Sequence, residues 1–264
     1  MDSGPDDPFN LADARYNEAP LNPQRTKEIE ELAAKPAAEG DAAAKALEAI
    51  LELCAYLNRW NRVGKSGVEA AEKEIAAALK INPNLAAAHY ARGFVFRTQG
   101  DHHNALAAFQ KAVEIEPDNA RFIAQAGAEL LYLGDADGAL KAVERALEVN
   151  PNSPARGMFL WIAARAHFFS GRYAEAIGLL EQSVQTWPDL WYTQAYRVSA
   201  CALIGDRTKA SQELANFIAR FPDLNTIERI VEAERTNPNN NRFVVEGRCK
   251  FHEGLAIAGM PLEV

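Results

Sequence analysis

The sequence has little of what a membrane-spanning or secreted protein needs. Its apolar stretches are short and interrupted by charged residues, and none approaches the roughly 20 apolar residues of a transmembrane helix. The first ten residues are acidic and contain no apolar segment, which predicts no secretory signal. Runs of β-branched residues are also scarce, whereas Ala, Leu and Glu are frequent, so we expect helix throughout.

Basic residues and cysteines are few as well. The chain has 28 Lys and Arg against 36 Asp and Glu, and residues 1–41 alone contain ten acids and four bases. Nothing resembles the basic face that binds phosphates, so we expect no nucleic-acid partner. The three cysteines (Cys54, Cys201 and Cys249) are odd in number and widely separated. This favours free thiols in a reducing cytoplasm over a disulfide or a metal site.

What the sequence does contain is a rhythm of about 34 residues, kept by three residue types. Prolines stand at 83, 117, 151, 188 and 222, glycines at 100, 134, 171 and 205, and alanines at 71, 105, 139, 176 and 210. Each series shows the same single step of 37 residues. The glycines are expected to end a first helix in a left-handed turn. The alanines let a second helix approach closely, and the prolines follow its end.

These residues resemble the tetratricopeptide repeat, whose unit is a 34-residue helix–turn–helix. The resemblance is greatest over residues 88–119, and Gly93, Gly127 and Phe109 fit its helix contacts. It implies an all-α solenoid of about five helical hairpins, the first degenerate and the fourth with a lengthened first helix. The predicted array spans 41–222, with units 44–85, 86–119, 120–153, 154–188 and 189–222.

The segments on either side of this array differ from it. Residues 223–264 include FVVEGRCKFHEGLAIAGMPLE, which resembles the tail after tetratricopeptide arrays in bacterial class III adenylate cyclases. Only about 40 residues precede the array, so we expect that module without a cyclase domain. The tail is predicted to form capping helices. Residues 1–40 are acidic and contain five prolines, which predicts a largely extended or disordered arm with a short helix over 26–35.

Two motifs suggest chemistry, but each has a simpler explanation. VGKSG (63–67) ends like a phosphate-binding loop, yet Arg59 stands where that loop needs glycine, and a helix rather than a strand is expected before it. His102 and His103 are adjacent on a helix and therefore point in different directions, which suits one metal ion poorly. No nucleophile–base spacing is present. We expect neither an enzyme nor a bound cofactor or metal.

The function is expected on the concave side, which the first helices line. Aromatic and arginine side chains recur there at helical spacing, and these residue types dominate binding hot spots. The alternative is that the rings pack between neighbouring units. The predicted peptide-binding groove consists of Tyr56, Trp60, Tyr90, Phe94, Arg97, Arg121, Gln125, Tyr132, Trp161, Arg165, Trp191, Tyr192 and Tyr196.

The sequence thus predicts a non-enzymatic adaptor or scaffold that binds a segment of another protein in this groove. The Lys/Asn/Lys/Arg clamp that captures a C-terminal carboxylate in some tetratricopeptide domains is missing. An alternative is a self-associating or structural subunit of a larger complex. The acidic arm, with Phe9 and Tyr16, would then dock in its own groove or in that of a neighbouring copy. The partner's identity cannot be deduced from the repeat alone.

Overall fold

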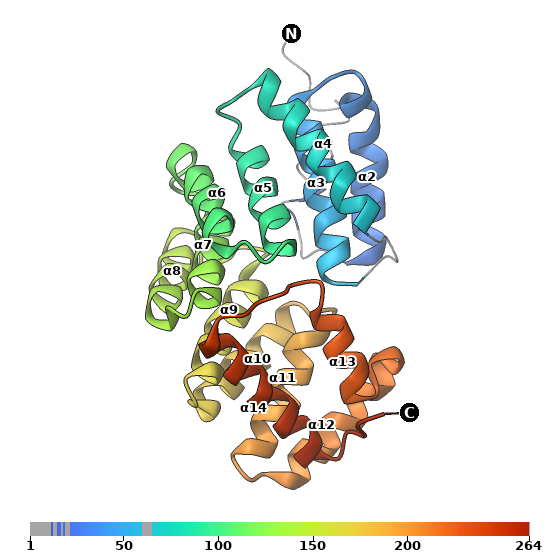
Figure 1. Ribbon diagram of the computed structural model, residues 1–264, viewed down its shortest axis with the longest axis vertical. Coiled ribbons are helices and arrows are strands. Elements are labelled where there is room, and N and C mark those ends of the chain that lie inside the picture. Colours follow the sequence, from blue (N-terminus) through green and yellow to red (C-terminus); the bar gives the residue numbers. More distant parts are fainter. Residues whose placement is uncertain (1–11, 13–14, 17, 19–21, 60–64, 264) are drawn as a thin grey trace. The chain divides into compact units, whose positions relative to one another are not determined.

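The computed structural model describes residues 12, 15, 16, 18, 22–59 and 65–263, and in these residues every regular element is a helix (Figure 1). The chain divides into two compact units, residues 1–123 and residues 124–264. Helix α7 (Ala120–Tyr132) crosses the boundary between them.

Unit 1 holds two long N-terminal helices followed by hairpins of the repeat. Its complete helices are α2 (Pro23–Ala38), α3 (Ala42–Leu57), α4 (Lys65–Ile81), α5 (Ala86–Thr98) and α6 (His102–Ile115). Helix α3 packs against α2, α4 and α5, and α5 packs against α6.

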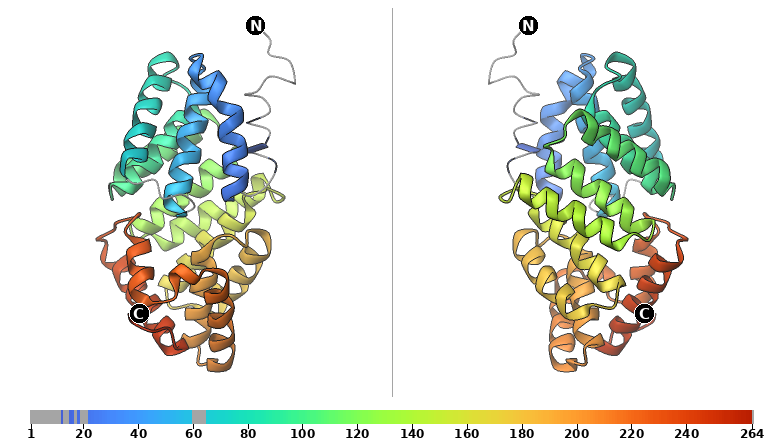
Figure 2. Two further views of the ribbon diagram at one scale, coloured as in Figure 1. Left: turned by 90° about the vertical axis from the view of Figure 1, so that its right-hand side faces the viewer. Right: turned by 90° about the vertical axis from the view of Figure 1, so that its left-hand side faces the viewer.

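Unit 2 continues the hairpins and ends in two further helices. Its complete helices are α8 (Ala136–Val149), α9 (Arg156–Phe169), α10 (Tyr173–Thr186), α11 (Trp191–Leu203), α12 (Arg207–Arg220), α13 (Ile227–Glu234) and α14 (Arg242–Ala258). A short 3-10 turn, Pro222–Leu224, joins α12 to α13. Helices α9 and α10, and likewise α11 and α12, form antiparallel pairs that both views of Figure 2 display.

The glycine rhythm marks the turn inside each hairpin, as predicted. Gly100, Gly134, Gly171 and Gly205 have φ between 75° and 93°. This left-handed backbone strains any residue that has a Cβ atom. The residue after each glycine donates its N–H to a carbonyl five positions earlier, which closes the helix end. In three of the four hairpins that residue is an aspartate, whose carboxylate accepts an N–H at the start of the next helix.

Small residues bring the helices of a hairpin together, which was also expected. A Cβ atom placed on Gly93 of α5 would lie 2.6 Å from the Phe109 ring of α6, and one on Gly127 would lie 2.7 Å from Ala142. Phe109 is fully buried in this contact. The spacing of small and large residues in the repeat therefore sets the distance between paired helices.

The lengthened fourth unit differs from the prediction. Helix α9 has 14 residues, only one more than α5, α7 and α11. The preceding turn, residues 150–155, has six residues, where the turns at 116–119 and 187–190 have four. The step of 37 residues therefore arises mainly in the turn. A surface turn absorbs extra residues without disturbing helix packing.

The N-terminal segment is more helical than its prolines and acids indicated. Helix α2 covers residues 23–38, where the sequence favoured a helix over 26–35 within an extended arm. Asn22 caps its start by accepting the Arg25 N–H, and Pro23 occupies the first helical position, which needs no N–H. Thr26, Ile29, Ala33 and Ala37 form a buried face on α2, which packs against α3. This packing stabilises a helix that propensity alone would not.

Candidate functional site

The predicted groove residues lie on the first helix of each hairpin, but most of them are covered. We call the side of these helices that points away from the second helices the inner face. Trp60 lies outside the described residues, and Tyr56 and Tyr192 are partly exposed. The buried residues of the predicted set are Tyr90, Phe94, Arg97, Arg121, Gln125, Tyr132, Trp161, Arg165, Trp191 and Tyr196. Different segments of the chain cover the inner face in the two units.

In unit 1 the covering residue is Tyr16, which is only 7% exposed. The Arg121 guanidinium lies 4.5 Å above the centre of the Tyr16 ring. This is a cation–π contact, which is stronger away from water. The Tyr16 and Tyr90 hydroxyl groups share a hydrogen bond. Tyr16 thus sits on two residues of the predicted groove. Whether these residues form a binding groove stays a prediction.

Two arginines also hold the main chain around Tyr16. Arg121 Nη2 donates to the Tyr16 carbonyl oxygen at 3.2 Å, and Arg25 of α2 donates to the Arg15 carbonyl oxygen. Arg25 Nη2 also lies 3.3 Å from the Glu18 carboxylate. The described residues of this segment have helical backbone, and residue 20 is a proline without an N–H. The Tyr16 carbonyl therefore lacks its usual helical donor, and Arg121 replaces it.

Burial changes the acid–base chemistry of this site. Desolvation raises the pKa of the Tyr16 hydroxyl, although the nearby Arg121 charge opposes the rise. Desolvation also raises the pKa of Tyr90 well above its ordinary value, and that of the Cys54 thiol to about 11. All three groups are therefore neutral near pH 7. The site is a buried aromatic cluster with a fixed positive charge, and the nearby Cys54 is not a reactive thiolate.

The other predicted groove residues of unit 1 belong to its core. Phe94 makes edge-to-face contacts with Tyr90 and Phe109, at centroid distances of 5.0 and 5.2 Å. The Arg97 guanidinium lies over the Phe94 ring at 5.0 Å. Tyr90 packs against Phe122 as well, at 4.6 Å. The alternative of rings packing between neighbouring helices thus describes Phe94, while Tyr90 has both roles.

In unit 2 the covering element is helix α14, which packs on α9, α11 and α12. The rings of Phe251 and Tyr196 are stacked 3.9 Å apart with an interplanar angle of 5°. Ser199 Oγ donates to the Phe251 carbonyl oxygen at 2.9 Å. A Cβ atom on Gly254 would come within 2.6 Å of the Ser199 carbonyl oxygen. The predicted cap therefore lies on the inner face and removes Tyr196 from any open groove.

The segment of residues 236–241 leads into α14 and contacts the end of α7. Asn237 Nδ2 donates to the Tyr132 hydroxyl, Asn239 Nδ2 to the Tyr132 carbonyl and Asn241 Nδ2 to the Leu133 carbonyl. The last two distances are 3.0 Å. Asn239 and Asn241 thereby satisfy carbonyls at the end of α7 that lack a helical partner.

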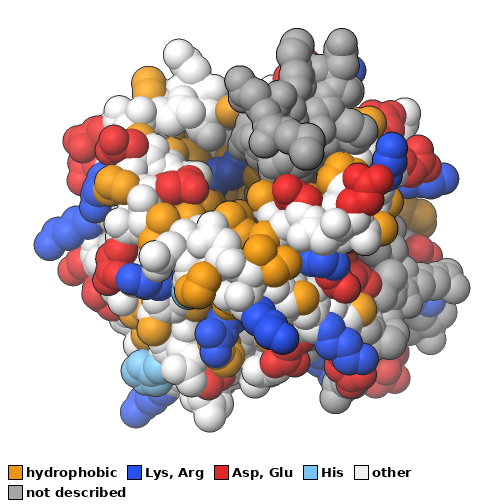
Figure 3. Space-filling view, turned by 90° about the horizontal axis from the view of Figure 1, so that it is seen from above, with side chains coloured by type: hydrophobic (Ala, Val, Ile, Leu, Met, Phe, Trp, Pro, Cys, Tyr) orange, Lys and Arg blue, Asp and Glu red, His pale blue; other side chains and the backbone are white. Residues whose placement is uncertain are grey.

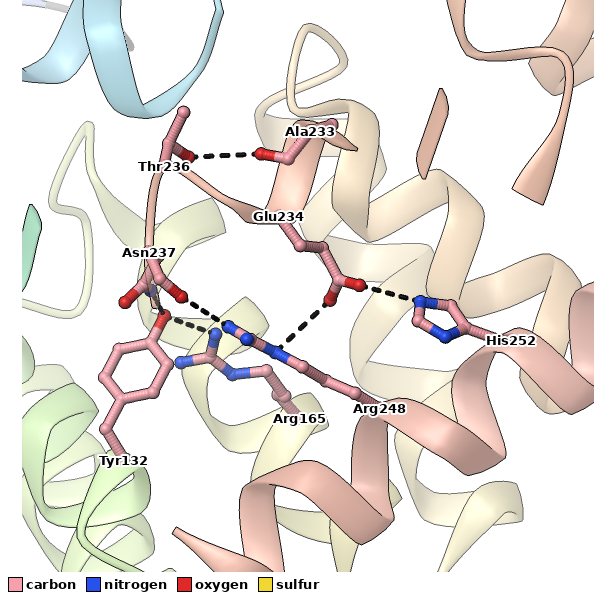
Figure 4. A network of polar contacts seen from close by, with 8 residues as sticks. All are labelled: Tyr132, Arg165, Ala233, Glu234, Thr236, Asn237, Arg248 and His252. Atoms are coloured by element: carbon pink, nitrogen blue, oxygen red, sulfur yellow. Dashed lines mark hydrogen bonds and ion pairs between the residues drawn. The ribbon is translucent and has the colours of Figure 1, made fainter. Parts of the chain in front are cut away.

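The polar side chains of unit 2 form a connected network on this face (Figure 4). Arg165 Nη1 donates to the Tyr132 hydroxyl at 2.6 Å, and its guanidinium lies 4.3 Å above the Tyr132 ring. Glu234 of α13 pairs with Arg248 Nε at 3.3 Å and with His252 Nε2 at 2.7 Å. The ion pairs join α13 to α14, so this network fastens the C-terminal helices to the hairpins.

Of the remaining predicted residues of unit 2, the aromatic ones lie together near the start of α11, and Gln125 of α7 contacts α9. Trp161 contacts Tyr192 at 4.8 Å and Tyr196 at 4.9 Å, and Trp191 contacts Tyr192 at 5.5 Å. Gln125 Nε2 lies 2.8 Å from the Met158 sulfur. Tyr192, the one partly exposed member, is the predicted groove residue of unit 2 that α14 leaves accessible.

Sequence reasoning missed Arg25, the three asparagines and the inward position of α14. The signals were present but short. Proline at position 20 removes a donor four residues after Tyr16, and asparagine occupies positions 237, 239, 240 and 241. Neither pattern indicates which distant helix it will meet.

Among the described residues, no group of three or more His, Cys, Asp or Glu side chains could hold a metal ion. No helix in the described part of the chain is long and apolar enough to cross a bilayer. The face shown in Figure 3 mixes acidic and basic side chains, and neither sign gathers into one large patch.

Comparison with known proteins bears on the hairpins. A family model described as tetratricopeptide repeat matches residues 86–119, and another with that description matches residues 125–190. These hairpins are tetratricopeptide repeats. A search of curated proteins finds no match. The likeness of the tail to that of adenylate cyclase arrays therefore stays a prediction.

Solved structures resemble the chain in fold. PilF of Pseudomonas aeruginosa is 19% identical with a TM-score of 0.54, covering 82% of this chain and 88% of PilF. A thermophilic TPR protein of Thermus thermophilus is 17% identical with a TM-score of 0.55, covering 75% of this chain and 98% of that protein. PilW, a type IV pilus biogenesis factor, is 17% identical with a TM-score of 0.57, covering 73% of this chain and 84% of PilW. The fold is thus that of an all-α tetratricopeptide solenoid.

Proposed function

We propose that this chain is a protein-interaction scaffold that binds a polypeptide segment on the inner face of unit 1. The observation that carries the proposal is the docking of Tyr16. The Arg121 guanidinium lies over the Tyr16 ring, and two arginines donate to main-chain carbonyl oxygens. This is how a repeat surface recognises a peptide, with an aromatic anchor for affinity and main-chain contacts for register.

Unit 2 is less suited to this role on the same face. Helix α14 covers Tyr196 and Phe169, and residues 236–241 occupy the end of α7. The groove predicted from the sequence is therefore proposed for unit 1 only, with Tyr90 and Arg121 as its main residues. Arg97, beside them, supplies further positive charge near the ring cluster.

The test is co-purification from host cells with the full chain, its Arg121→Ala variant and an Arg229→Ala control. Arg229 is an exposed arginine of unit 2. We expect a partner that the wild type and the control capture equally and that Arg121→Ala loses at least tenfold, the effect of about 1.4 kcal/mol. A partner captured equally by all three forms, or no partner in any form, would contradict the proposal.

Self-association is the second candidate, because the docking of Tyr16 could equally take place between two copies. Its contacts would be unchanged if the N-terminal segments of two chains were exchanged. Light scattering of the purified wild type across a hundredfold range of concentration decides this. A dimer that Tyr16→Ala converts to monomer would support exchange, and a monomer throughout would rule it out.

The rest of the proposal concerns location and chemistry. The three cysteines are free, and that fits the reducing cytoplasm rather than an oxidising compartment. We further propose that the chain is not an enzyme and binds no nucleic acid, because we expect its function to consist of peptide binding alone. A homogeneous preparation that shows turnover of a substrate, or salt-dependent nucleic-acid binding, would contradict this.

A further inference from the structure

We infer that the partner of unit 1 is a short helix that ends just after a tyrosine, with a small residue four positions before it. We further infer that residues 12–18 hold its place as a tethered competitor. The inference rests on the proposed function and names the chemistry of the ligand. It follows from three features of the docked segment.

The first feature is the spacing of its buried residues. Ala12 is fully buried and Tyr16 nearly so, and both have helical backbone. Positions i and i+4 share one face of a helix. The side chains of Arg15 and Glu18, in contrast, are 57% and 58% exposed. Among the described residues of the docked segment, the buried positions are thus one small residue and one ring at helical spacing.

The second feature is the recognition of a helix end. The carbonyl groups of the last turn lack intrahelical donors, and the Tyr16 carbonyl lacks one in any case because residue 20 is proline. Arg121 and Arg25 donate to the Tyr16 and Arg15 carbonyls. Positive charge at this end is also favoured by the helix dipole. Another polypeptide offers the same acceptors only if its helix ends at the same distance from its tyrosine.

The third feature is charge. Arg25 lies 3.3 Å from the Glu18 carboxylate, two residues after the anchor, and Arg121 lies on the anchor itself. Residues 1–41 have a net charge of −6, whereas the rest of the chain is nearly neutral. An acidic segment is thus attracted to the two arginines, and we expect an acidic residue two positions after the tyrosine of the partner.

The docked segment can act as a competitor because it is attached a few residues away. Helix α2 begins at Pro23, and its cap Asn22 is extended, so the docked helix ends before residue 22. A short tether gives an effective concentration on the order of millimolar. If the docked segment itself binds the site with a dissociation constant of about 100 μM, a free ligand binds the intact chain about tenfold more weakly than a chain with an empty site.

The test uses a fluorescein-labelled peptide with the sequence of residues 8–22 and measures anisotropy with the full chain. The protein forms are the wild type, Tyr16→Ala, Tyr16→Ala with Arg121→Ala, and Arg15→Ala. Arg15→Ala is the matched control, because it lies next to Tyr16 and its side chain is in solvent. We expect the peptide to bind Tyr16→Ala at least about tenfold more tightly than the wild type or Arg15→Ala.

Two further measurements locate the binding. Adding Arg121→Ala to Tyr16→Ala should weaken binding by fivefold or more, and a peptide with alanine in place of its tyrosine should not bind. A Tyr16→Phe chain keeps the ring in the site and should exclude the peptide almost as well as the wild type. Because this variant leaves the packing intact, it tests the competition even if Tyr16→Ala disturbs the fold, which circular dichroism would reveal.

Equal peptide binding by the wild type and Tyr16→Ala, or no saturable binding by Tyr16→Ala, would overturn the inference. The proposed function fails separately. If capture of a partner depends on Arg121 but is unaffected by Tyr16→Ala, the proposed scaffold function is retained and the inference of a tethered competitor is wrong. If no captured partner depends on Arg121, the proposed function itself is wrong.

Discussion

The two units cover the inner faces of their hairpins by different means. In unit 1, one tyrosine and two arginine–carbonyl contacts hold a short N-terminal segment in place. In unit 2, a 17-residue helix, α14, buries Phe251 completely against Tyr196 and brings Gly254 close to Ser199. The first arrangement is a docked peptide and the second is part of a hydrophobic core.

This difference decides what each covering segment can do. A docked segment can leave while the helices beneath it stay folded, so its contribution to stability is limited to its own docking free energy. A core helix cannot leave without exposing the apolar surface of its neighbours, which couples its loss to unfolding of the unit. We therefore propose that the repeat surface is available for exchange in unit 1, whereas α14 covers it in unit 2.

The largest expected effect is that of Phe251→Ala in α14. The ring is fully buried and stacked on Tyr196, so its removal should lower the free energy of unfolding by about 3–5 kcal/mol. Urea denaturation followed by circular dichroism measures this. Val245→Ala is the control, since Val245 is 41% exposed on the same helix and should change stability by less than about 0.5 kcal/mol. Similar losses for both would mean that α14 is not a core helix.

A smaller loss is expected when the contact between α14 and α11 is made too tight. Gly254→Ala places a Cβ atom 2.6 Å from the Ser199 carbonyl oxygen, which should destabilise the unit by about 1–3 kcal/mol. Gly178→Ala in α10 is the matched control. Its Cβ meets nothing within 4 Å, so better helix propensity should stabilise the chain by roughly 0.5–1 kcal/mol. Thermal unfolding should shift in opposite directions, and a shared direction would contradict the close contact.

Tyr16→Ala should have a smaller effect than Phe251→Ala although both remove a buried aromatic ring. Its loss cannot exceed the docking free energy of the segment, which we expect to be about 1–2 kcal/mol from one ring and its charged hydrogen bonds. Hydrogen exchange should show opening around Tyr90 with the helices of unit 1 still protected. If Tyr16→Ala unfolds unit 1 as a whole, the segment is part of the core and the comparison of the two units fails.

The smallest expected effect is a pH dependence confined to alkaline solution. Burial raises the pKa of Tyr16 in the folded protein, so its docking contributes fully below the ordinary tyrosine value near 10 and is lost as pH rises. Between pH 10 and 11 the loss should be no more than about 1.4 kcal/mol. The stability difference between the wild type and Tyr16→Phe should narrow over this range. An unchanged difference would show that Tyr16 is not held as the neutral phenol.

Much of the fold could be predicted because the repeat is local. The glycine turns, the aspartate caps and the Gly93–Phe109 contact each involve residues within about one repeat of each other. Local spacing of this kind is written directly in the order of residues. The step of 37 residues was also visible, but its position in the turn before α9 was not, because turns and helix ends both tolerate insertion.

The candidate site was harder to predict from the sequence. In both units, the segment that covers the inner face is far along the chain from the residues that it contacts. Arg121 meets Tyr16 across 105 positions, and Asn237 meets Tyr132 across 105 positions. A stripe of aromatic and arginine side chains looks the same whether a partner, a terminal segment or a neighbouring helix lies on it. Phe94 and Tyr196 are core residues, whereas Tyr90 and Arg121 contact Tyr16.

The sequence by itself therefore determined the helical hairpins, since periodic glycine, alanine and proline act through contacts between near neighbours. It also determined that the inner helices would present rings and arginines. Only the tertiary structure decided which of those residues are buried by another segment of the chain. The hydrophobic effect is non-directional, so any apolar segment that comes into contact with the inner face can cover it. Helix α14 packs on the inner face of unit 2, and Tyr16 lies on that of unit 1.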